Sequence, residues 1–297
     1  MAGIHFMLPT PFNTNGRVNT TPLSALVDLA VSSGCVGIVA LGVMGEAHRL
    51  SDIERNNVLK AVVEANKGRM MVTAGISSQS NHVVVERALE AEKLGATSVM
   101  ACPPRFTKPN ESQVFDYYSA INRATHLPIV VQDLPEQSGI QMSSEFISVL
   151  NNEISNVGHL KLEDPPTPPK ITQVINATKG KMEIFGGLGG VFLFEELNRG
   201  ASGTMTGFAY PEVLVSVYQK LQDGEKENAR KIFYKWLPLI RYENSSGISL
   251  SIRKHIMAYR GLLTNPSIRP PTPAIDETSI LELHDLLGAI NLNKETL

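Results

Sequence analysis

Eight short apolar runs, separated by longer stretches with helical periodicity, constrain the fold of this chain more than any other feature of its sequence. Most of these runs are rich in β-branched residues and lack a clean alternation of polar and apolar positions. Strands that are buried on both faces of a parallel sheet have this pattern. The runs are 3–8, 37–41, 70–74, 97–101, 128–132, 158–162, 183–187 and 203–207.

The stretches between the runs predict amphipathic helices. Many begin with Ser, Thr or Asn and end at or near Gly, which are the usual start and stop signals. Eight strand–helix units within about 220 residues favour an α/β fold of the (β/α)8 (TIM) barrel type over an open doubly wound sheet. No strand is expected after Tyr210, so we expect a catalytic barrel over residues 1–224 and a C-terminal helical region over residues 225–297. The clearest helical stretches are 20–34, 50–68, 80–95, 111–125 and 143–152.

The charge balance and composition exclude several functional classes. The chain of 297 residues has a formal net charge of −2, so neither a nucleic acid nor an anionic membrane is expected as a partner. No apolar stretch approaches the roughly 18 residues that span a bilayer, and the N-terminus does not resemble a signal peptide. Cys35 and Cys102 are expected to be buried thiols of a reducing compartment, which favours a cytoplasmic location. The seven histidines lack metal-ligand spacing, so no metal site is predicted.

Lys161 stands in the middle of the run 158–162, and Glu163 follows two positions later. Because side chains alternate across a strand, both are expected to face the barrel interior near the C-terminal ends of the strands, where barrel enzymes have their active sites. Burial favours an uncharged amine, which can attack a carbonyl carbon, and Glu163 could then remove a proton beside the resulting Schiff base. A buried structural ion pair would have the same spacing, so both interpretations stay open. His159 is expected to face the surrounding helices.

Six segments together resemble the dihydrodipicolinate synthase / N-acetylneuraminate lyase family, whose members are class I, Schiff-base (β/α)8 enzymes. The segments are LPTPFNTNGRV, GVMGEAHRLSDIER, PIVVQDLPEQSG, GHLKLED, FGGLGG and GASGTMTG. Their order and spacing carry the resemblance, because no single segment is specific. The resemblance implies that Lys161 forms the Schiff base with a small 2-keto acid, that no other cofactor is needed, and that the chain assembles as a homotetramer, a dimer of dimers.

Two departures from the usual family motifs bear on the branch that the chain resembles. Relatives carry two hydroxyl side chains after strand two, whereas this chain has Val43 and Met44 between Gly42 and Gly45. Backbone N–H groups of this segment are therefore left to bind the carboxylate of the substrate. Relatives also carry a tyrosine that relays protons at the end of strand five, whereas this chain has Gln132, whose amide can only form hydrogen bonds.

Gln137 stands where dihydrodipicolinate synthases carry an arginine, so an activity in lysine biosynthesis is not expected. The pattern Q-D-x-P with K-x-E is instead similar to the L-2-keto-3-deoxyarabonate dehydratases of the superfamily. This resemblance implies a lyase of carbohydrate metabolism that removes water from a 2-keto-3-deoxy sugar acid, giving 2,5-dioxopentanoate from L-2-keto-3-deoxyarabonate. Lys161 would be the nucleophile, Glu163 the general acid and base, and Gln132 the anchor of the substrate hydroxyl.

Gly186 and Thr206 are the remaining candidates for substrate binding. Gly186 precedes the loop after strand seven, where barrels often bind an anion and where small residues leave room for a substrate chain. Thr206 follows strand eight and either contacts the distal hydroxyls of the substrate or only packs. Two other functions stay open: a pyruvate-dependent aldolase or lyase, and a relative that binds keto acids without turnover.

Overall fold

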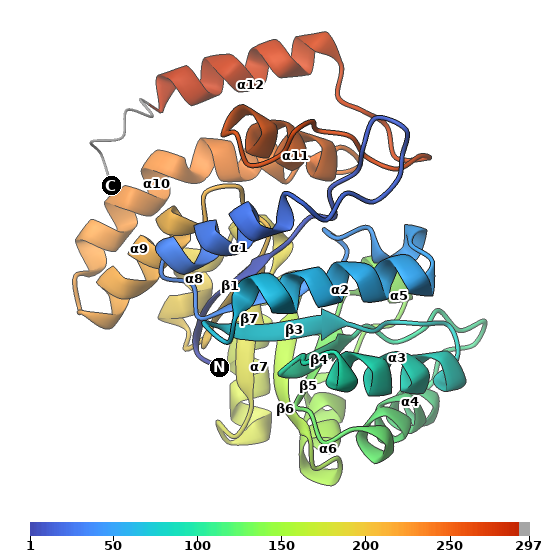
Figure 1. Ribbon diagram of the computed structural model, residues 1–297. Helices are drawn as coiled ribbons and strands as arrows, with labels where there is room; N and C mark the ends of the chain where they lie inside the picture. The colour runs from blue at the N-terminus through green and yellow to red at the C-terminus, as the bar shows by residue number, and fades with distance from the viewer. Residues whose placement is uncertain (291–297) are drawn as a thin grey trace.

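A computed structural model, which describes residues 1–290, shows a closed barrel of eight parallel strands in which β8 pairs with β1 (Figure 1). Each predicted run overlaps one of these strands, with bounds that agree to within one residue, so the expected α/β (TIM) barrel is confirmed. The strands are Gly3–Met7 (β1), Gly37–Ala40 (β2), Met71–Gly75 (β3), Ser98–Ala101 (β4), Ile129–Asp133 (β5), Val157–Leu162 (β6), Glu183–Gly186 (β7) and Gly203–Thr206 (β8).

Local capping signals fix where the surrounding helices begin. The hydroxyl of Ser51 accepts a hydrogen bond from the backbone N–H of Glu54, and the Glu54 carboxylate accepts one from the N–H of Ser51. Such bonds satisfy N–H groups that the first turn of a helix leaves unpaired. The helices along the barrel are Leu23–Ser32 (α1), Asp52–Asn66 (α2), Asn81–Lys93 (α3), Glu111–Ala124 (α4), Pro135–Ser138 (α5), Ser144–Glu153 (α6), Thr167–Thr178 (α7), Leu193–Asn198 (α8) and Pro211–Gln222 (α9), with short 3₁₀ turns at Ala47–Arg49 (η1) and Leu188–Gly190 (η2).

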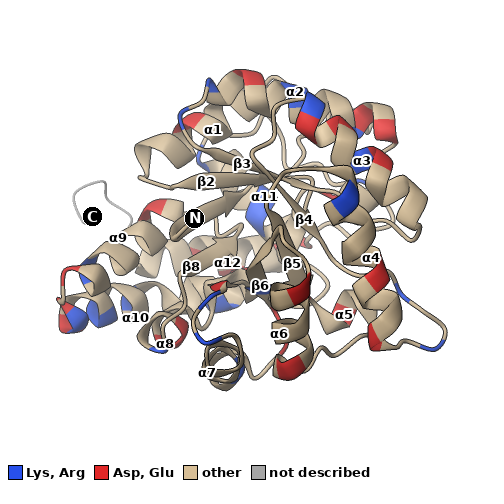
Figure 2. Ribbon diagram, turned by 90° about the horizontal axis from the view of Figure 1, so that it is seen from below, with Lys and Arg blue, Asp and Glu red and all other residues tan. Residues whose placement is uncertain are grey.

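Three further helices, Lys226–Glu243 (α10), Ser249–Tyr259 (α11) and Glu277–Ala289 (α12), lie together beyond α1 and α9 in Figure 1. A buried ion pair joins this layer to the barrel, because the Lys254 Nζ of α11 lies 2.7 Å from an oxygen of Glu46 in the turn after β2. Viewed along the barrel, the basic part of α11 lies behind its centre (Figure 2). The C-terminal layer therefore covers one end of the barrel.

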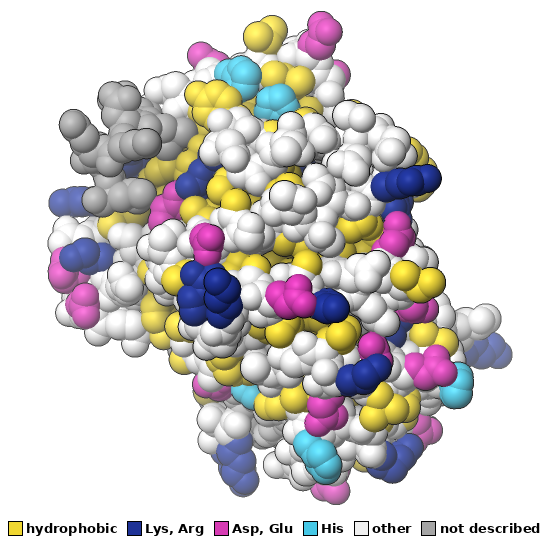
Figure 3. Space-filling model, in the orientation of Figure 1, with side chains coloured by type: hydrophobic (Ala, Val, Ile, Leu, Met, Phe, Trp, Pro, Cys, Tyr) yellow, Lys and Arg dark blue, Asp and Glu magenta, His cyan; other side chains and the backbone are white. Residues whose placement is uncertain are grey.

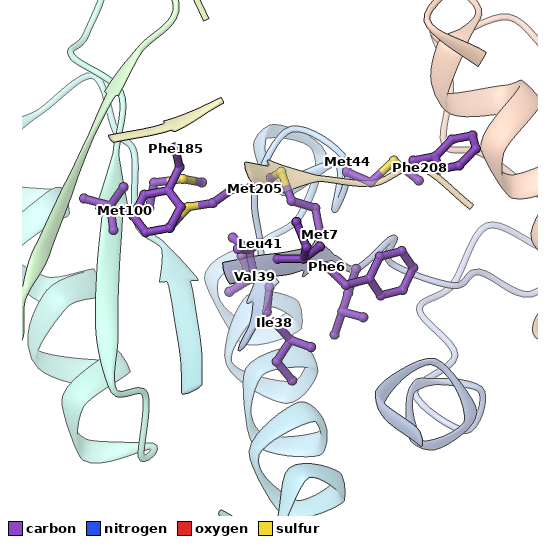
Figure 4. Packing of buried hydrophobic residues seen from close by; sticks show 14 of the residues in the cluster. Phe6, Met7, Ile38, Val39, Leu41, Met44, Met100, Phe185, Met205 and Phe208 are labelled. Atoms are coloured by element: carbon purple, nitrogen blue, oxygen red, sulfur yellow. The ribbon is translucent and has the colours of Figure 1, made fainter. Parts of the chain in front are cut away.

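Methionine side chains from several strands and loops fill much of the barrel interior near this covered end. Met7, Met44, Met100 and Met205 are all buried and belong to one hydrophobic cluster (Figure 4). Unbranched thioether chains fill irregular gaps and adapt to a changing neighbour. The interior at this level is thus apolar and adaptable, and the few polar groups within it stand out.

The outer surface carries acidic and basic side chains that are interspersed on the face shown in Figure 3. Within residues 1–290, no helix is both long and apolar enough to cross a membrane.

Candidate active site

The centre of the site is Lys161, which is 2% exposed and lies on β6. Its Nζ atom lies 3.1 Å from Oε2 of Glu163 and donates a hydrogen bond of 3.2 Å to the Sδ atom of Met7. The strand register pairs Lys161 with Gln132 on β5 and with Phe185 on β7, so these three side chains share the inner face of the barrel. The amine is therefore buried with one charged partner and one weak acceptor.

Glu163 is held from three sides. Its Oε2 atom accepts a hydrogen bond of 2.7 Å from the Gln132 amide, and its Oε1 atom accepts one of 3.4 Å from the N–H of Leu188. Its own N–H donates to the carbonyl oxygen of Asp133 at 2.8 Å. Gly187 leaves room for this arrangement, because a Cβ there would overlap the Glu163 side chain. One carboxylate oxygen thus contacts both the amine and the amide.

Lys161 and Glu163 open into a cavity of about 300 Å³ at the C-terminal ends of the strands. This volume lies at the lower end of the range for small-molecule sites. Residues of α11 and of the loop before it close the cavity, among them Asn244, Ser249 and Arg253. A second cavity of about 580 Å³ lies beside it, and Val43 and His48 line both.

The turn after β2 forms another wall of the smaller cavity. Leu41 and Glu46, at the two ends of this turn, have φ angles of 61° and 51°, a left-handed conformation that non-glycine residues rarely adopt. Within the described chain, the N–H groups of Val43 and Met44 have no hydrogen-bond acceptor, and both residues line the cavity. Unpaired N–H groups in such a turn are suited to bind an anion.

Comparison with known proteins agrees with this geometry. The sequence profile of the dihydrodipicolinate synthetase family matches residues 1–290. The chain belongs to this family. Its members are lyases, so the chain is placed in a family of lyases that act on small molecules.

Individual members of the dihydrodipicolinate synthetase family differ in the activities for which they are named. An L-2-keto-3-deoxyarabonate dehydratase from Azospirillum brasilense is 31% identical over 95% of this chain and 92% of its own length. A 4-hydroxy-tetrahydrodipicolinate synthase from Methanocaldococcus jannaschii is 27% identical over 80% of this chain and 82% of its own length. The crystal structure of a dihydrodipicolinate synthase from Rhodopseudomonas palustris superposes with a TM-score of 0.92 at 32% identity and covers 97% of each chain.

The structure brings most of the site residues expected for this family member into one place. Lys161, Glu163, Val43, Met44 and Thr206 line the smaller cavity. Thr206 follows the interior-facing Met205 and is buried at the end of β8. The arrangement joins an amine, a carboxylate and free N–H groups around one void.

Four expected site residues lie differently. Gln132 lines the larger cavity together with Gly42 and reaches the smaller one through its bond to Glu163, so its amide positions the carboxylate. Gly45 lines neither cavity, and its N–H donates to the carbonyl oxygen of Gly42 at 3.0 Å. Gly186 does not reach the cavity either, because its α-carbon faces Glu196 behind the strand. The next residues, Leu188 and Gly189, line the cavity instead.

Sequence reasoning missed the contribution of the C-terminal layer. Arg253 and Asn244 line the smaller cavity, and Arg49 of η1 reaches it from the barrel side. A signal for one of them was present, since Arg253 and Lys254 interrupt the apolar positions of the segment SLSIRKHIMAY. Buried charges on a helix require partners, and that requirement could have directed attention to them.

Charged groups behind the strands support the site without lining it. Lys170 of α7 lies 2.6 Å from Asp133, which ends β5, and 2.7 Å from Asp164, which follows Glu163. Burial raises the pKa of Asp133 to about 6, and Lys170 opposes this rise. Burial also raises the pKa of Cys102 to about 12, so this thiol of the larger cavity stays protonated. In the described part of the chain, no group of three or more His, Cys, Asp or Glu residues is placed to hold a metal ion.

Proposed function

We propose that this chain is a Schiff-base dehydratase that acts on a 2-keto-3-deoxy sugar acid and converts L-2-keto-3-deoxyarabonate to 2,5-dioxopentanoate. The observation that carries this proposal is the sharing of one Glu163 oxygen between the Lys161 amine and the Gln132 amide, at 3.1 Å and 2.7 Å. Among residues 1–290, no tyrosine hydroxyl lines the cavity. Glu163, which contacts the Lys161 amine, is therefore the group that we assign to proton transfer. The 31% identity to the Azospirillum brasilense dehydratase supports the same activity.

The first step would form the covalent intermediate. Lys161 passes an ammonium proton to Glu163, and the free amine attacks the C2 carbonyl carbon of the substrate. Glu163 returns this proton to the hydroxyl of the addition product, which leaves as water and gives an iminium ion between Nζ and C2, with Glu163 again a carboxylate. The N–H groups of Val43 and Met44 would hold the C1 carboxylate, because they are unpaired and line the same cavity.

The second step would expel the hydroxyl group. The iminium ion withdraws electrons from C3, so the Glu163 carboxylate can remove a C3 proton to form an enamine. The carboxylic acid returns that proton to the C4 hydroxyl, which leaves as water while a C3–C4 double bond forms. Loss of a C5 proton and protonation at C3 then give the 5-enol, which becomes the aldehyde. Hydrolysis of the iminium releases 2,5-dioxopentanoate and restores Lys161.

A pyruvate-dependent aldolase is the second candidate, because the family also contains synthases such as that of Methanocaldococcus jannaschii. Cleavage between C3 and C4 requires a base on the C4 hydroxyl. Gln132 stands at the end of β5 and offers only an amide, which does not accept a proton in this way. This substitution favours loss of water over carbon–carbon cleavage.

Two measurements would test the proposal. Borohydride with pyruvate is expected to leave a reduced adduct on Lys161, detected by peptide mass spectrometry, with Lys170 unmodified as an internal control. Incubation with L-2-keto-3-deoxyarabonate is expected to give a product that is lighter by one water. Release of pyruvate and glycolaldehyde would instead identify the aldolase, and an unmodified Lys161 would exclude the Schiff-base mechanism.

A further inference from the structure

Arg253 of α11 is a buried cation that has no part in the reaction proposed above. It is 9% exposed and lines the same cavity as Lys161 and Glu163. Within residues 1–290, only its Nη2 atom has a hydrogen-bond acceptor, which is Oδ1 of Asn244 at 3.3 Å. The buried Nε lies 3.4 Å from an oxygen of Glu243, an ion-pair contact that does not have hydrogen-bond geometry. A guanidinium carries five N–H donors, and leaving most of them unpaired away from water is costly unless a ligand completes them.

The backbone after β7 places this guanidinium relative to Glu163. The N–H of Leu188 donates to Glu163, and the next residue, Gly189, lies against Arg253. A Cβ at Gly189 would come within 2.6 Å of Nη2, so the glycine makes room for the arginine. Arg253 therefore contacts the residue that directly follows Leu188, the hydrogen-bond donor to Glu163.

The order of these groups parallels the order of the atoms in the proposed substrate. The amine of Lys161 would react with C2, and Glu163 would transfer protons at C3 and C4. Arg253 and Asn244 come next along the wall, where C5 and its oxygen would lie.

The charge around Arg253 indicates which distal group would fit. Glu243 is fully buried behind it, with an oxygen 3.4 Å from Nε, and also accepts hydrogen bonds from the N–H of Ala209. Burial raises the pKa of Glu243 to about 7, and Arg253 opposes this rise. The cavity wall in addition contains Glu163 and Glu136, and its other cations, Lys161 and Arg49, lie 3.1 Å from Glu163 and 3.7 Å from Glu46. Above neutral pH the ionised Glu243 therefore balances the positive charge of the guanidinium, which still offers its N–H groups as hydrogen-bond donors.

We propose that Arg253, with Asn244, binds the hydroxyl oxygen at the end of the substrate chain remote from the keto acid. The site accordingly selects hydroxylated keto acids with one carboxylate over dicarboxylic keto acids. This inference rests on the proposed function for the identity of the substrate. A subsite built to hydrogen-bond a hydroxyl discriminates strongly against an analogue that lacks it.

Calorimetric binding at pH 8 tests the inference, because Glu243 is then ionised and no turnover is needed. The probes are L-2-keto-3-deoxyarabonate, 4-hydroxy-2-oxopentanoate of the same length, which lacks only the terminal hydroxyl, and 2-oxoglutarate with a distal carboxylate. A Glu163→Gln background keeps the first probe from being consumed. L-2-keto-3-deoxyarabonate is expected to bind roughly 10- to 100-fold more tightly than 4-hydroxy-2-oxopentanoate, the range for a hydrogen bond to a charged group.

Arg253→Met is expected to reduce this preference to within about threefold, and Arg253→Lys to restore part of it. Pyruvate binding, which does not involve the distal end, should change little in either variant, whereas general damage to the fold would weaken all probes alike. Arg260→Met is the matched control, since Arg260 ends the same helix and pairs with Glu212 at 2.6 Å outside the cavity. Its preference should equal that of the parent.

An unchanged preference in Arg253→Met would overturn the inference, as would tighter binding of 2-oxoglutarate than of L-2-keto-3-deoxyarabonate in the parent. These binding ratios are independent of the water-loss assay. If no water were lost but the ratios behaved as expected, the dehydratase proposal would fail while the role of Arg253 would stand.

Discussion

Among residues 1–290, two lysine–glutamate pairs are buried, and they differ in what surrounds them. Lys161 lies 3.1 Å from Glu163, and Lys254 lies 2.7 Å from Glu46. Both lysines are almost completely buried, with exposures of 2% and 0%. Burial and pairing alone would therefore assign the two pairs the same role.

The ammonium group of Lys254 has a full set of partners. Besides Glu46 it donates to the carbonyl oxygens of Thr10 at 2.8 Å and Ser267 at 2.9 Å, and it lies 4.4 Å from the centre of the Phe12 ring. The amine of Lys161 has only Glu163 and a thioether, and it opens into the cavity. The comparison teaches that saturation of the donors and the presence of a void separate a structural pair from a reactive one.

Lys161→Met should have the largest effect, because it removes the cavity amine that would form the Schiff base. We expect kcat/KM for L-2-keto-3-deoxyarabonate to fall by about 10⁴-fold or more and borohydride trapping to disappear. The free energy of unfolding should change by less than about 2 kcal/mol, because Glu163 keeps its other partners. Residual Schiff-base chemistry in this variant would contradict the assignment.

Glu163→Gln should separate the two steps of the reaction. Loss of the acid and base is expected to slow water loss by about 10²- to 10⁴-fold. Trapping of pyruvate on Lys161 should persist at a lower rate, since the amine remains in place and water of the cavity takes over the acceptance of its proton. Single-turnover mass spectrometry would measure both steps, and a variant that lost water at the parental rate would remove Glu163 from the mechanism.

Lys254→Met should have the opposite profile from Lys161→Met. Breaking this fully buried pair leaves the Glu46 carboxylate with the more distant guanidinium of Arg49, 3.7 Å away, and we expect a loss of about 3–5 kcal/mol in the free energy of unfolding by urea. The double variant Lys254→Met/Glu46→Gln should recover part of this loss, because no isolated charge then stays buried. A loss below about 1 kcal/mol in the single variant would show that the pair is not structural.

His5 at the opposite end of the barrel should control stability without affecting the reaction. Its Nε2 atom lies 2.8 Å from the Met1 carbonyl oxygen, its ring packs edge-on against Phe185, and burial lowers its pKa from 6.5 to about 4. The unfolded chain binds a proton below pH 6.5 and the folded chain does not. This contribution to stability is therefore complete above pH 6.5 and is lost as the pH falls toward 4, by about 3 kcal/mol.

His5→Gln keeps a hydrogen-bond donor and removes the titrating group. Its free energy of unfolding should decline less steeply between pH 7 and pH 4.5 than that of the parent, whereas kcat/KM at pH 8 should be unchanged. Parallel declines in the two proteins would assign the acid sensitivity to other groups.

The fold could be predicted from the sequence because it depends on local patterns. Apolar runs at regular intervals and capping residues such as Ser51 identify the strands and helix starts without knowledge of distant contacts. The two-residue spacing of Lys161 and Glu163 also placed them on one inner face. The same rule shows that the expectation for His159 is wrong: two positions before Lys161 it shares that face, and it pairs with Glu183 at 3.1 Å.

The rest of the site could not be predicted because it depends on tertiary packing. Arg253 reaches the cavity only because α11 folds back over the barrel, a contact between segments far apart in the chain. Gly186 was expected to contact substrate. Successive residues of β7 face opposite sides of the barrel wall, however, so Gly186 faces Glu196 and not the cavity. Gln132 was expected to anchor the substrate hydroxyl, and only the coordinates reveal its bond to Glu163.

The bond between Lys254 and Glu46 joins positions 208 residues apart, and it has a consequence for any attempt to shorten or recombine this protein. A fragment ending at residue 224 would contain every strand of the barrel. It would nevertheless lack Lys254, the nearest cation to the Glu46 carboxylate, and the residues of α11 that close the substrate cavity. Chimeras with related barrels should therefore exchange the turn after β2 together with α11, because Glu46 in the turn pairs with Lys254 in α11.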